Sequence, residues 1–347
     1  ARVRAHEDDG DGAWKRWRVS KPRVMSGMRP TGALHVGHLV GVLTQWANYC
    51  ETAEAFFEIA DLHAYTTGFA DPQAIRAARE EMVAVWLAAG VDPAKATIYL
   101  QSGVPEIEEL HTLLGMIVPV SWLERVPSYK GQIEALGSEI ATYGFLGYPL
   151  LQLCDIAIFR GERVPVGRDQ VAHLEFGREV VRRFNHLYGE GREVLVEPQP
   201  TLSEFPEVPG IDGRKMSKSY DNAIFIADDE ETTTRKVRSM VTDPQKIRRG
   251  DPGRPEICPV FALWRFANPL RLDGIAATCR SGELGCVADK SDFAEALNAY
   301  LRPVRERLSG FRADRVLVDG IIAEGTARAR EIAAGVLRDV KRAMKLG

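Results

Sequence analysis

Two short motifs in this 347-residue sequence carry residue types suited to binding a polyphosphate. The first is Leu-His-Val-Gly-His at 34–38, in which His35 and His38 stand three positions apart. On a helix this spacing brings both imidazoles to one face, where they can donate to phosphate oxygens. Gly37 has no Cβ and leaves room for a flat ring such as adenine. Alone, the pattern also fits a pair of structural histidines.

The second motif is Gly-Arg-Lys-Met-Ser-Lys-Ser at 213–219. Lys215 and Lys218 stand close together in a loop that begins with glycine, so they can form a mobile cationic arm for a polyphosphate. A solvated surface loop is the alternative. The motif follows the histidine motif in the chain and lies where predicted strands give way to predicted helices, and this order favours phosphate binding.

The elements around the first motif indicate how it is positioned. A short apolar run at 24–25 predicts a strand, 26–32 is rich in turn residues, and 36–51 is predicted to be helical. A helix that begins after a strand presents free N–H groups and the positive end of its dipole to an anion. The histidine motif is therefore expected at a phosphate-binding helix N-terminus.

The same alternation of strand and helix continues along the chain. Further strands are predicted at 56–60, 97–100 and 194–196, and a helix begins at Asp71-Pro72 and ends at Gly90. This alternation predicts an α/β fold, a Rossmann-like parallel sheet with helices on both faces and ligands at the carboxyl ends of the strands.

The pattern changes after about residue 220, where strands stop. Residues 227–347 are predicted to be helical, with acidic residues at 228–231 followed by basic ones, an order that suits the helix dipole. The last segment predicts an amphipathic docking helix, because four apolar residues repeat at a spacing of four: Ile332, Val336, Val340 and Met344.

The composition excludes several classes of protein. Hydrophobic residues make up 45% and charged residues 27%, the balance of a soluble globular chain. No apolar run approaches the about 18 residues of a membrane span, and the N-terminus is charged, so neither a span nor a retained signal peptide is expected. The net charge of −3 means that nucleic-acid contacts would need a local basic patch. Five cysteines, an odd number, favour the reducing cytoplasm over a secreted disulfide scaffold.

Together the two motifs resemble the paired signatures of class I aminoacyl-tRNA synthetases, whose Rossmann-like domain activates an amino acid with ATP. Further segments are similar to the tryptophanyl-tRNA synthetase family, and the likeness covers residues 23–347. These segments are 26–32, 60–64, 123–130, 148–149 with 155–156, 164–173, 215–222 and 242–243. Two positions depart from many bacterial members, which have asparagine in place of His38 and methionine in place of Gln152.

The resemblance implies a tryptophan–tRNA ligase. Such an enzyme forms tryptophanyl-adenylate and pyrophosphate from L-tryptophan and ATP, and then transfers the amino acid to tRNA(Trp) in protein synthesis. The expected organisation is a flexible extension at 1–20, a Rossmann-like catalytic domain with the dimer-forming helices at 21–220, a helical tRNA anticodon-binding domain at 221–325, and a C-terminal helix at 326–347 that docks on the catalytic domain.

Activation needs little covalent chemistry from the protein. The amino-acid carboxylate is already an anion, so no general base is required, and catalysis consists of positioning and of neutralising charge on the leaving pyrophosphate. The catalytic residues expected are His35, His38, Lys215 and Lys218, and the resemblance adds Lys130. The resemblance implies an ATP site formed by Arg29, Pro30, Thr31, Gly37, His38, Gly167, Arg168, Asp169, Ile211, Lys215, Met216, Ser217, Lys218 and Ser219. Mg²⁺ is expected to arrive on the phosphates, with no carboxylate cage of its own.

Tyr148, Gln152 and Asp155 stand at i, i+4 and i+7 and share one face of a predicted helix. An indole N–H only donates and an ionised aspartate only accepts, so a buried Asp155 would recognise tryptophan and reject phenylalanine. A tyrosine hydroxyl satisfies the same logic, and the triad is similar to that of tyrosyl-tRNA synthetase. The segments at 26–32 and 167–170 favour tryptophan. By the same likeness, Tyr148 and Gln170 hold the α-amino group.

Three cysteines resemble part of a four-cysteine iron–sulfur pattern found in some bacterial members of the family. These are Cys258, Cys279 and Cys286, and Asp289 stands at the fourth position. Three thiolates and one aspartate match the usual ligand set poorly, so we expect reduced cysteines and no iron–sulfur cluster. His63 and His111 are expected to pack or hydrogen-bond, and no metal site is predicted.

Other functions and partners follow from the same residues. A tyrosyl-tRNA synthetase is the first alternative, and a nucleotidylyltransferase or a partner-binding paralogue that retains the activation site are further ones. The resemblance implies a homodimer with the apolar segment 113–118 near its interface. Residues 14–18, which combine tryptophan with basic residues, are a candidate segment for binding an additional protein.

Overall fold

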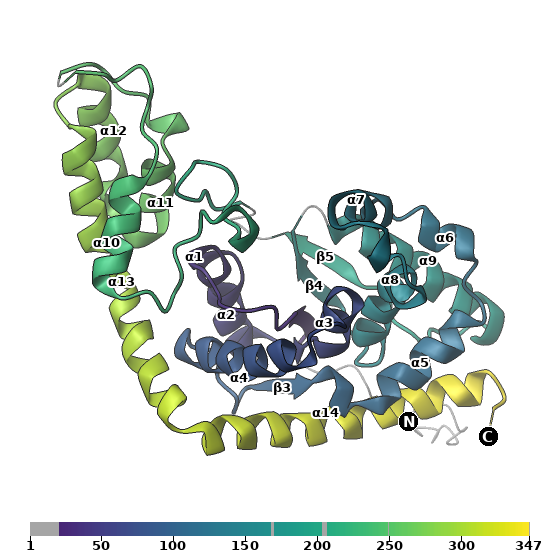
Figure 1. Cartoon of the computed structure of the whole chain (residues 1–347). Coiled ribbons are helices and arrows are strands. Elements are labelled where there is room, and N and C mark those ends of the chain that lie inside the picture. The colour runs from purple at the N-terminus through teal and green to yellow at the C-terminus, as the bar shows by residue number, and fades with distance from the viewer. Residues whose placement is uncertain (1–20, 168–169, 203–206, 249, 347) are drawn as a thin grey trace, which may run out of the picture.

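The computed structural model describes residues 21–167, 170–202, 207–248 and 250–346. Its centre is a parallel sheet in the order β3-β2-β1-β4-β5 (Figure 1). The strands are β1 (Arg23–Met28), β2 (Glu54–Ile59), β3 (Ala96–Leu100), β4 (Arg163–Val166) and β5 (Gln199–Leu202). The order reverses between β1 and β4, and in such sheets a ligand crevice opens at that point. The predicted α/β, Rossmann-like class is confirmed.

Helices cover both faces of this sheet, and the strands β1, β2 and β3 are largely buried. Phe56 packs in one hydrophobic cluster and its neighbour Phe57 in the other, as the alternation of side chains along a strand requires. The helices of this part are α1 (Val36–His38), a π-helix (Leu39–Leu43), α2 (Thr44–Thr52), α3 (Asp61–Gly68), α4 (Pro72–Ala88), α5 (Pro105–Gly115), α6 (Val120–Glu124), α7 (Pro127–Leu136), α8 (Tyr143–Ala157) and α9 (Val171–Tyr188). Short 3₁₀ turns lie at Gln101–Gly103, Ser138–Ile140, Lys218–Tyr220, Pro255–Ile257 and Pro269–Arg271.

The predicted helix at 36–51 is present but interrupted. One turn of π-helix separates α1 from α2, because the Thr44 N–H pairs with the carbonyl of Leu39, five residues back. The Thr44 hydroxyl donates to the same carbonyl at 2.9 Å. A single π turn of this kind is common at functional sites, and here it follows the histidine motif directly.

Two other predictions have different outcomes. The ends of α4 are confirmed: the Asp71 carboxylate accepts from the Ala74 N–H at 3.0 Å, and Gly90 adopts φ +104° after the helix. The predicted strand at 194–196 is wrong. Backbone N–H groups of this segment bond to a side chain and not to a strand: the amide oxygen of Asn185 accepts from the N–H groups of Val194 and Leu195 at 3.0 and 3.1 Å. The strand of this region, β5, begins at Gln199.

A helical arm extends from this α/β body (Figure 1). It consists of α10 (Glu230–Ser239), α11 (Pro259–Ala267), α12 (Leu272–Ser281) and α13 (Cys286–Ala313). Among the described residues, β5 is the last strand in the chain, as the sequence predicts. None of the helices in the described ranges has the length and apolar character needed to cross a bilayer.

The last helix, α14 (Arg315–Ala343), leaves the arm and runs along the body beside β3 and α5 (Figure 1). It is already helical at residue 315 and continues without a break through 326. A Cβ on Gly325 would lie 1.8 Å from the Ile98 carbonyl oxygen, so the helix backbone contacts β3 directly. Val336 and Val340 are buried as predicted, whereas Ile332 and Met344 are only partly buried. The buried face of α14 is completed by Ala329, Ala333 and Leu337.

Candidate active site

A cavity of about 550 Å³ opens at the carboxyl ends of β1 and β4, where the strand order reverses. Side chains from β1, β2, α3, α8, β4 and the loop at 213–219 line it. The residues predicted for the site that line this cavity are Arg29, Thr31, His38, Tyr148, Gln152, Asp155, Gly167, Gln170 and Lys218. Segments far apart in the sequence therefore meet in one cavity.

One end of the cavity holds a buried carboxylate. Asp155, on α8, is 2% exposed and receives an N–H donor on each oxygen. The Gln101 amide donates to Oδ1 at 2.9 Å, and His63 Nε2 lies 2.8 Å from Oδ2. Two donors of this kind suit an ionised carboxylate, which still has free lone pairs toward the cavity. Asp155 can thus accept a hydrogen bond from a ligand.

A second carboxyl group, Glu58, lies beside Asp155. It sits on β2 and is also 2% exposed, and the Tyr99 hydroxyl donates to its Oε1 at 3.1 Å. Burial and the adjacent charge of Asp155 raise the pKa of Glu58 well above its usual value. Both effects favour the neutral carboxylic acid over the carboxylate at Glu58.

Three polar side chains in the cavity wall form a hydrogen-bonded chain. The Tyr148 hydroxyl and His173 Nε2 are 2.9 Å apart, and His173 Nδ1 lies 2.8 Å from Gln170 Oε1. This chain fixes the orientation of Tyr148 and Gln170, both predicted to bind the amino acid. Gln152, one turn after Tyr148 on α8, also lines the cavity.

The other end of the cavity contains the histidine motif at the start of α1. The two imidazole rings lie against each other at an interplanar angle of 36°, with centroids 3.8 Å apart, and the backbone N–H of His35 donates to His38 Nδ1 at 3.2 Å. Burial lowers the pKa of His35 to about 4, with the charges of Lys218 and Lys215 contributing. Burial also lowers the pKa of His38 to about 3, assisted by His35 and Lys218. Both rings are therefore neutral at pH 7.

Gly37 has a structural role that the sequence did not indicate. A Cβ at this position would lie 2.9 Å from the ring of His35. A Cβ essentially never approaches a non-bonded atom this closely, so a side chain here would displace the imidazole. Glycine therefore permits the position that His35 adopts.

The loop at 213–219 is held against the first motif. Lys218 Nζ donates to the Thr31 carbonyl at 2.9 Å, and burial together with the Arg29 charge lowers the pKa of Lys218. The side chain of Asn222, 1% exposed, shapes the loop. It accepts from the Ser217 N–H at 2.8 Å and donates to the Lys215 carbonyl at 3.1 Å.

Some predicted residues lie next to the cavity and not in its wall. Those described residues are Pro30, His35, Gly37, Ile211, Lys215, Met216, Ser217 and Ser219. Met216 is 3% exposed and packs in the hydrophobic core, which anchors the loop between the two lysines. Arg168, Asp169 and residues 1–20 lie outside the described residues, as does the side chain of Lys130 on α7.

Sequence reasoning did not identify Glu58 and Gln101, and it assigned His63 only to packing or hydrogen bonding. The signals were present, because Glu58 interrupts the apolar run of β2 and Gln101 directly follows β3. A charged residue in a buried parallel strand requires a partner. A polar residue at the carboxyl end of such a strand lies at the ligand-binding edge.

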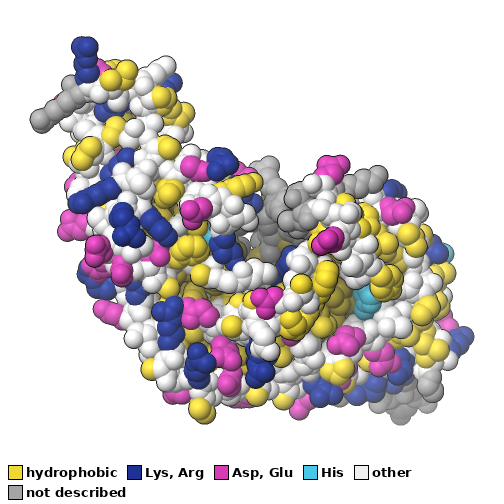
Figure 2. Space-filling view, viewed as in Figure 1, with side chains coloured by type: hydrophobic (Ala, Val, Ile, Leu, Met, Phe, Trp, Pro, Cys, Tyr) yellow, Lys and Arg dark blue, Asp and Glu magenta, His cyan; other side chains and the backbone are white. Residues whose placement is uncertain are grey.

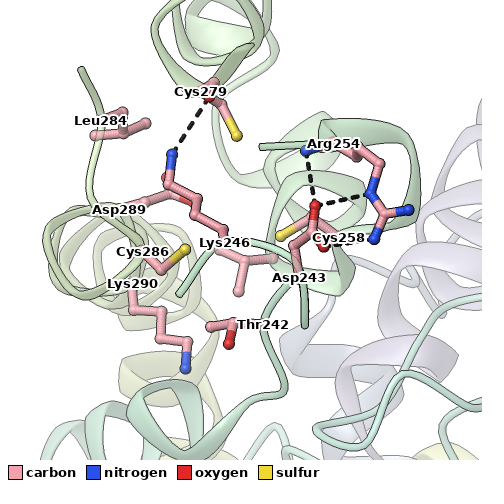
Figure 3. A pocket seen from close by; sticks show the side chains of 11 residues that line it. Thr242, Asp243, Lys246, Arg254, Cys258, Cys279, Leu284, Cys286, Asp289 and Lys290 are labelled. Atoms are coloured by element: carbon pink, nitrogen blue, oxygen red, sulfur yellow. Dashed lines mark hydrogen bonds and ion pairs between the residues drawn. The ribbon is translucent and has the colours of Figure 1, made fainter. Parts of the chain in front are cut away.

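The three cysteines and Asp289 line a separate, small cavity in the arm (Figure 3). Asp289 accepts from the Trp264 indole at 3.0 Å, and Lys246 Nζ lies among the cysteines, donating to the Cys279 carbonyl at 3.3 Å. Within the described part of the chain, no three His, Cys, Asp or Glu side chains converge as a metal site would require. This side-chain set does not fit an iron–sulfur cluster.

Comparison with known proteins agrees with this geometry. Residues 18–302 match the family described as class I tRNA synthetases (W and Y). The chain is 44% identical to the tryptophan–tRNA ligase of Thermotoga maritima, with 93% of this chain and 99% of the relative covered. It is 40% identical to that of Aquifex aeolicus, with 93% and 100% covered.

Solved structures give the same result. Tryptophanyl-tRNA synthetase from Campylobacter jejuni, complexed with ADP and tryptophan, superimposes with a TM-score of 0.84 at 31% identity, covering 93% of this chain and 100% of the other. Tyrosyl-tRNA synthetase from Archaeoglobus fulgidus, complexed with L-tyrosine, gives a TM-score of 0.65 at 23% identity over 84% and 91%. At that identity the likeness to the tyrosine enzyme concerns the fold alone.

Proposed function

The chain belongs to the class I tRNA synthetases of the tryptophan and tyrosine group, and from this premise we infer that it is a tryptophan–tRNA ligase. It activates L-tryptophan with ATP, releases pyrophosphate and transfers the amino acid to tRNA(Trp). The observation that carries this function is one cavity that has a buried carboxylate, Asp155, at one end and the cation of Lys218 at the other. The choice of tryptophan over tyrosine follows the relatives at 40–44% identity.

At the nucleotide end, we propose that MgATP binds with its phosphates at the start of α1 and against the loop at 213–219. His35 and His38 are neutral imidazoles, so each offers one N–H to a phosphate oxygen. Lys215 and Lys218 supply the positive charge. Arg29, which lines the cavity and lies close to Lys218, adds to it. The remaining residues predicted for ATP, together with Lys130, complete the proposed site.

Magnesium is expected to arrive as part of this substrate. Among the described residues, no group of three or more His, Cys, Asp or Glu side chains is placed to hold the ion by itself. A cation carried by the phosphates and a few waters fits such a site, because Mg²⁺ dehydrates reluctantly.

At the amino-acid end, we propose that Asp155 accepts from the indole N–H and that Tyr148 and Gln170 hold the α-amino group. Gln152 lies between them along α8. This orientation directs the tryptophan carboxylate toward the α-phosphate. Attack forms the carboxyl–phosphate bond and breaks the bond to pyrophosphate, whose growing charge is neutralised by the loop lysines.

The arm and the body have separate proposed roles. Residues 221–325 are proposed to bind the tRNA anticodon and 326–347 to dock on the catalytic domain at 21–220. Figure 2 shows Lys and Arg side chains on the arm, interspersed with Asp and Glu. A homodimer is proposed near 113–118, where the exposed side chains of Met116, Val120 and Tyr143 provide apolar surface. Because tRNA is charged where ribosomes work, a cytoplasmic location is proposed.

The deciding experiment is ATP–pyrophosphate exchange with each of the twenty amino acids, followed by charging of tRNA(Trp). We expect tryptophan to support the fastest exchange and to be transferred. Faster exchange with tyrosine would favour the tyrosyl enzyme, and no exchange with any amino acid would favour a partner-binding paralogue. Light scattering at micromolar concentration tests the dimer, and a monomer mass would contradict it. Pull-down with and without residues 1–20 tests the proposed binding of an additional protein.

A further inference from the structure

We propose that Glu58 is a second residue that determines tryptophan specificity: as a neutral carboxylic acid it donates a hydrogen bond to Asp155 and thereby keeps Asp155 an anionic acceptor for the indole N–H. This inference rests on the proposed function of the cavity. It concerns a positioning residue, because Glu58 acts on the ligand through Asp155.

Glu58 is enclosed by three strands and a helix. Its Oε1 accepts from Tyr99 on β3 at 3.1 Å, and Tyr99 is itself fully buried. Its Oε2 faces β1, where a Cβ on Gly27 would lie 3.0 Å away. Glu58 and Asp155 both line the cavity and are hydrogen-bonded to each other. Two carboxyl groups in such contact hold one proton between them.

The surrounding donors decide which carboxyl group carries that proton. Asp155 receives two N–H donors, from Gln101 and His63, whereas Glu58 receives one O–H donor from Tyr99. Donors stabilise the ionised form of the group that accepts them, so Asp155 is the anion and the proton lies on Glu58.

One further charged group near Glu58 acts in the same direction, whereas the hydrogen bond from Tyr99 lowers the pKa of Glu58. Asp61, at the start of α3, raises the pKa of Glu58 further, in addition to burial and Asp155. β1 contributes Gly27 and no charge at this point, and β3 contributes the neutral phenol of Tyr99. His63, also on α3, faces Asp155.

The location of the proton determines which ligand fits. An aspartate has about four acceptor positions. Gln101, His63 and Glu58 occupy three, which leaves one for a donor in the cavity. If the proton moved to Asp155 and its O–H turned into the cavity, that side chain would present a donor to the ligand. An indole N–H cannot accept a hydrogen bond, whereas a phenol oxygen can, so the shift would penalise tryptophan and tolerate tyrosine.

The test compares Glu58→Gln with Glu58→Leu. Glutamine has the same shape, cannot ionise, donates from its amide to Asp155 and accepts from Tyr99. We expect E58Q to bind tryptophan within about threefold of the parent, and E58L to bind it about tenfold or more weakly, with the KM for ATP unchanged in both. Tyrosine affinity should change less than tryptophan affinity in E58L.

A pH series separates this role from a merely structural one. Glu58 is neutral below its raised pKa, so tryptophan affinity of the parent should fall as the pH rises through that value. E58Q should lack this component. Titration of the amino group of tryptophan affects both proteins equally, so its effect cancels in the ratio of the two tryptophan affinities. Infrared spectra should show a protonated-carboxyl band at neutral pH that E58Q lacks.

Several outcomes would overturn the inference. These are a loss of tryptophan binding in E58Q as large as in E58L, a constant ratio of affinities across the pH range, or the absence of the infrared band. A different result would show that the proposed function is wrong. A parent protein that exchanges pyrophosphate with tyrosine and not tryptophan would refute the function, while the infrared band would still report the state of Glu58.

Discussion

The two ends of the active-site cavity are built on opposite principles. At the amino-acid end, Asp155 is buried and already has donors on both oxygens. At the nucleotide end, His35 Nδ1 is buried without a hydrogen-bond partner among the described residues, and Lys218 is held by the Thr31 backbone. At one end, fixed donors hold the carboxylate before any ligand binds and leave one acceptor position for the ligand. The other end has unused donors and positive charge that an anion would satisfy.

This difference matches two different tasks. A buried carboxylate needs fixed donors. A ligand without a donor leaves one acceptor position of the carboxylate unpaired, so this end of the cavity selects ligands that carry a donor. Cations and free N–H groups interact most strongly when negative charge develops next to them in the transition state, so they raise the rate of the activation step. Selection and acceleration should therefore respond separately to mutation, which the following predictions test from the largest expected effect to the smallest.

Replacing the cation of the loop should have the largest effect. Lys218→Ala should lower the turnover of ATP–pyrophosphate exchange about 10²–10³-fold, since the charge it meets exists chiefly in the transition state. Tryptophan affinity should stay close to that of the parent. Lys341→Ala, which removes a surface lysine paired with Glu109, is the control. If K218A bound tryptophan poorly and turned over normally, the separation of the two ends would be wrong.

Changing the carboxylate should have the next largest effect, on affinity. Asp155→Asn should weaken tryptophan binding by about 1.5–3 kcal/mol, the range for a hydrogen bond to a charged group in a buried site. For an analogue with carbon or sulfur in place of the ring nitrogen, the same substitution should weaken binding much less, because that ligand has no donor at this position. Calorimetric titration of both ligands gives the comparison, and equal losses would mean that Asp155 serves the fold and not the indole.

The two histidines should make folding sensitive to acid. Their pKa values are about 4 and 3 in the folded protein and near 6.5 when unfolded. The unfolded chain therefore binds more protons below pH 6.5, and stability falls as the pH drops through that range. Between about pH 7 and about pH 6, His35→Gln/His38→Gln should lose about 1–2 kcal/mol less unfolding free energy than the parent.

Urea unfolding at both pH values measures this effect. His186→Gln is a matched control, because that histidine is exposed on α9. A double variant with the same acid sensitivity as the parent would show that His35 and His38 do not lower the unfolding free energy at acid pH. Addition of ATP should reduce the acid sensitivity of the parent, since phosphate favours the charged imidazoles.

The smallest effect is expected on the wall between the two ends. Tyr148→Phe removes the hydroxyl that pairs with His173 and should weaken tryptophan binding by about 0.5–1.5 kcal/mol, the net worth of one hydrogen bond. The KM for ATP should not change. Comparison of both Michaelis constants is sufficient, and a loss as large as that of D155N would make Tyr148 part of the selective end.

The sequence predicts those parts of the site that are local in the chain. His35 with His38, Lys215 with Lys218, and the face shared by Tyr148 and Asp155 are spacings within one element, so periodicity reveals them. The pairing of Asp155 with partners on α3 and after β3 depends on how the sheet brings three elements together, and no spacing encodes it.

Backbone pairing limits prediction in the same way. The apolar run at 194–196 has the composition of a strand, yet its N–H groups bond to the side chain of Asn185, nine residues earlier. The π turn at 39–43 depends on one hydrogen bond from Thr44, which an ordinary helical periodicity does not reveal.

The position of α14 also has a consequence for how the protein is made. β3 is the edge strand of the sheet, and its outer edge is covered by the last helix of the chain: the Leu100 N–H donates to Thr326 at 3.0 Å, and Gly325 lies against Ile98. A ribosome must therefore synthesise the chain through α14 before this edge is capped. Throughout synthesis, the nascent chain presents an open strand edge to other chains. Premature termination before residue 315 should thus yield an aggregating product, and not merely an enzyme that lacks a helix.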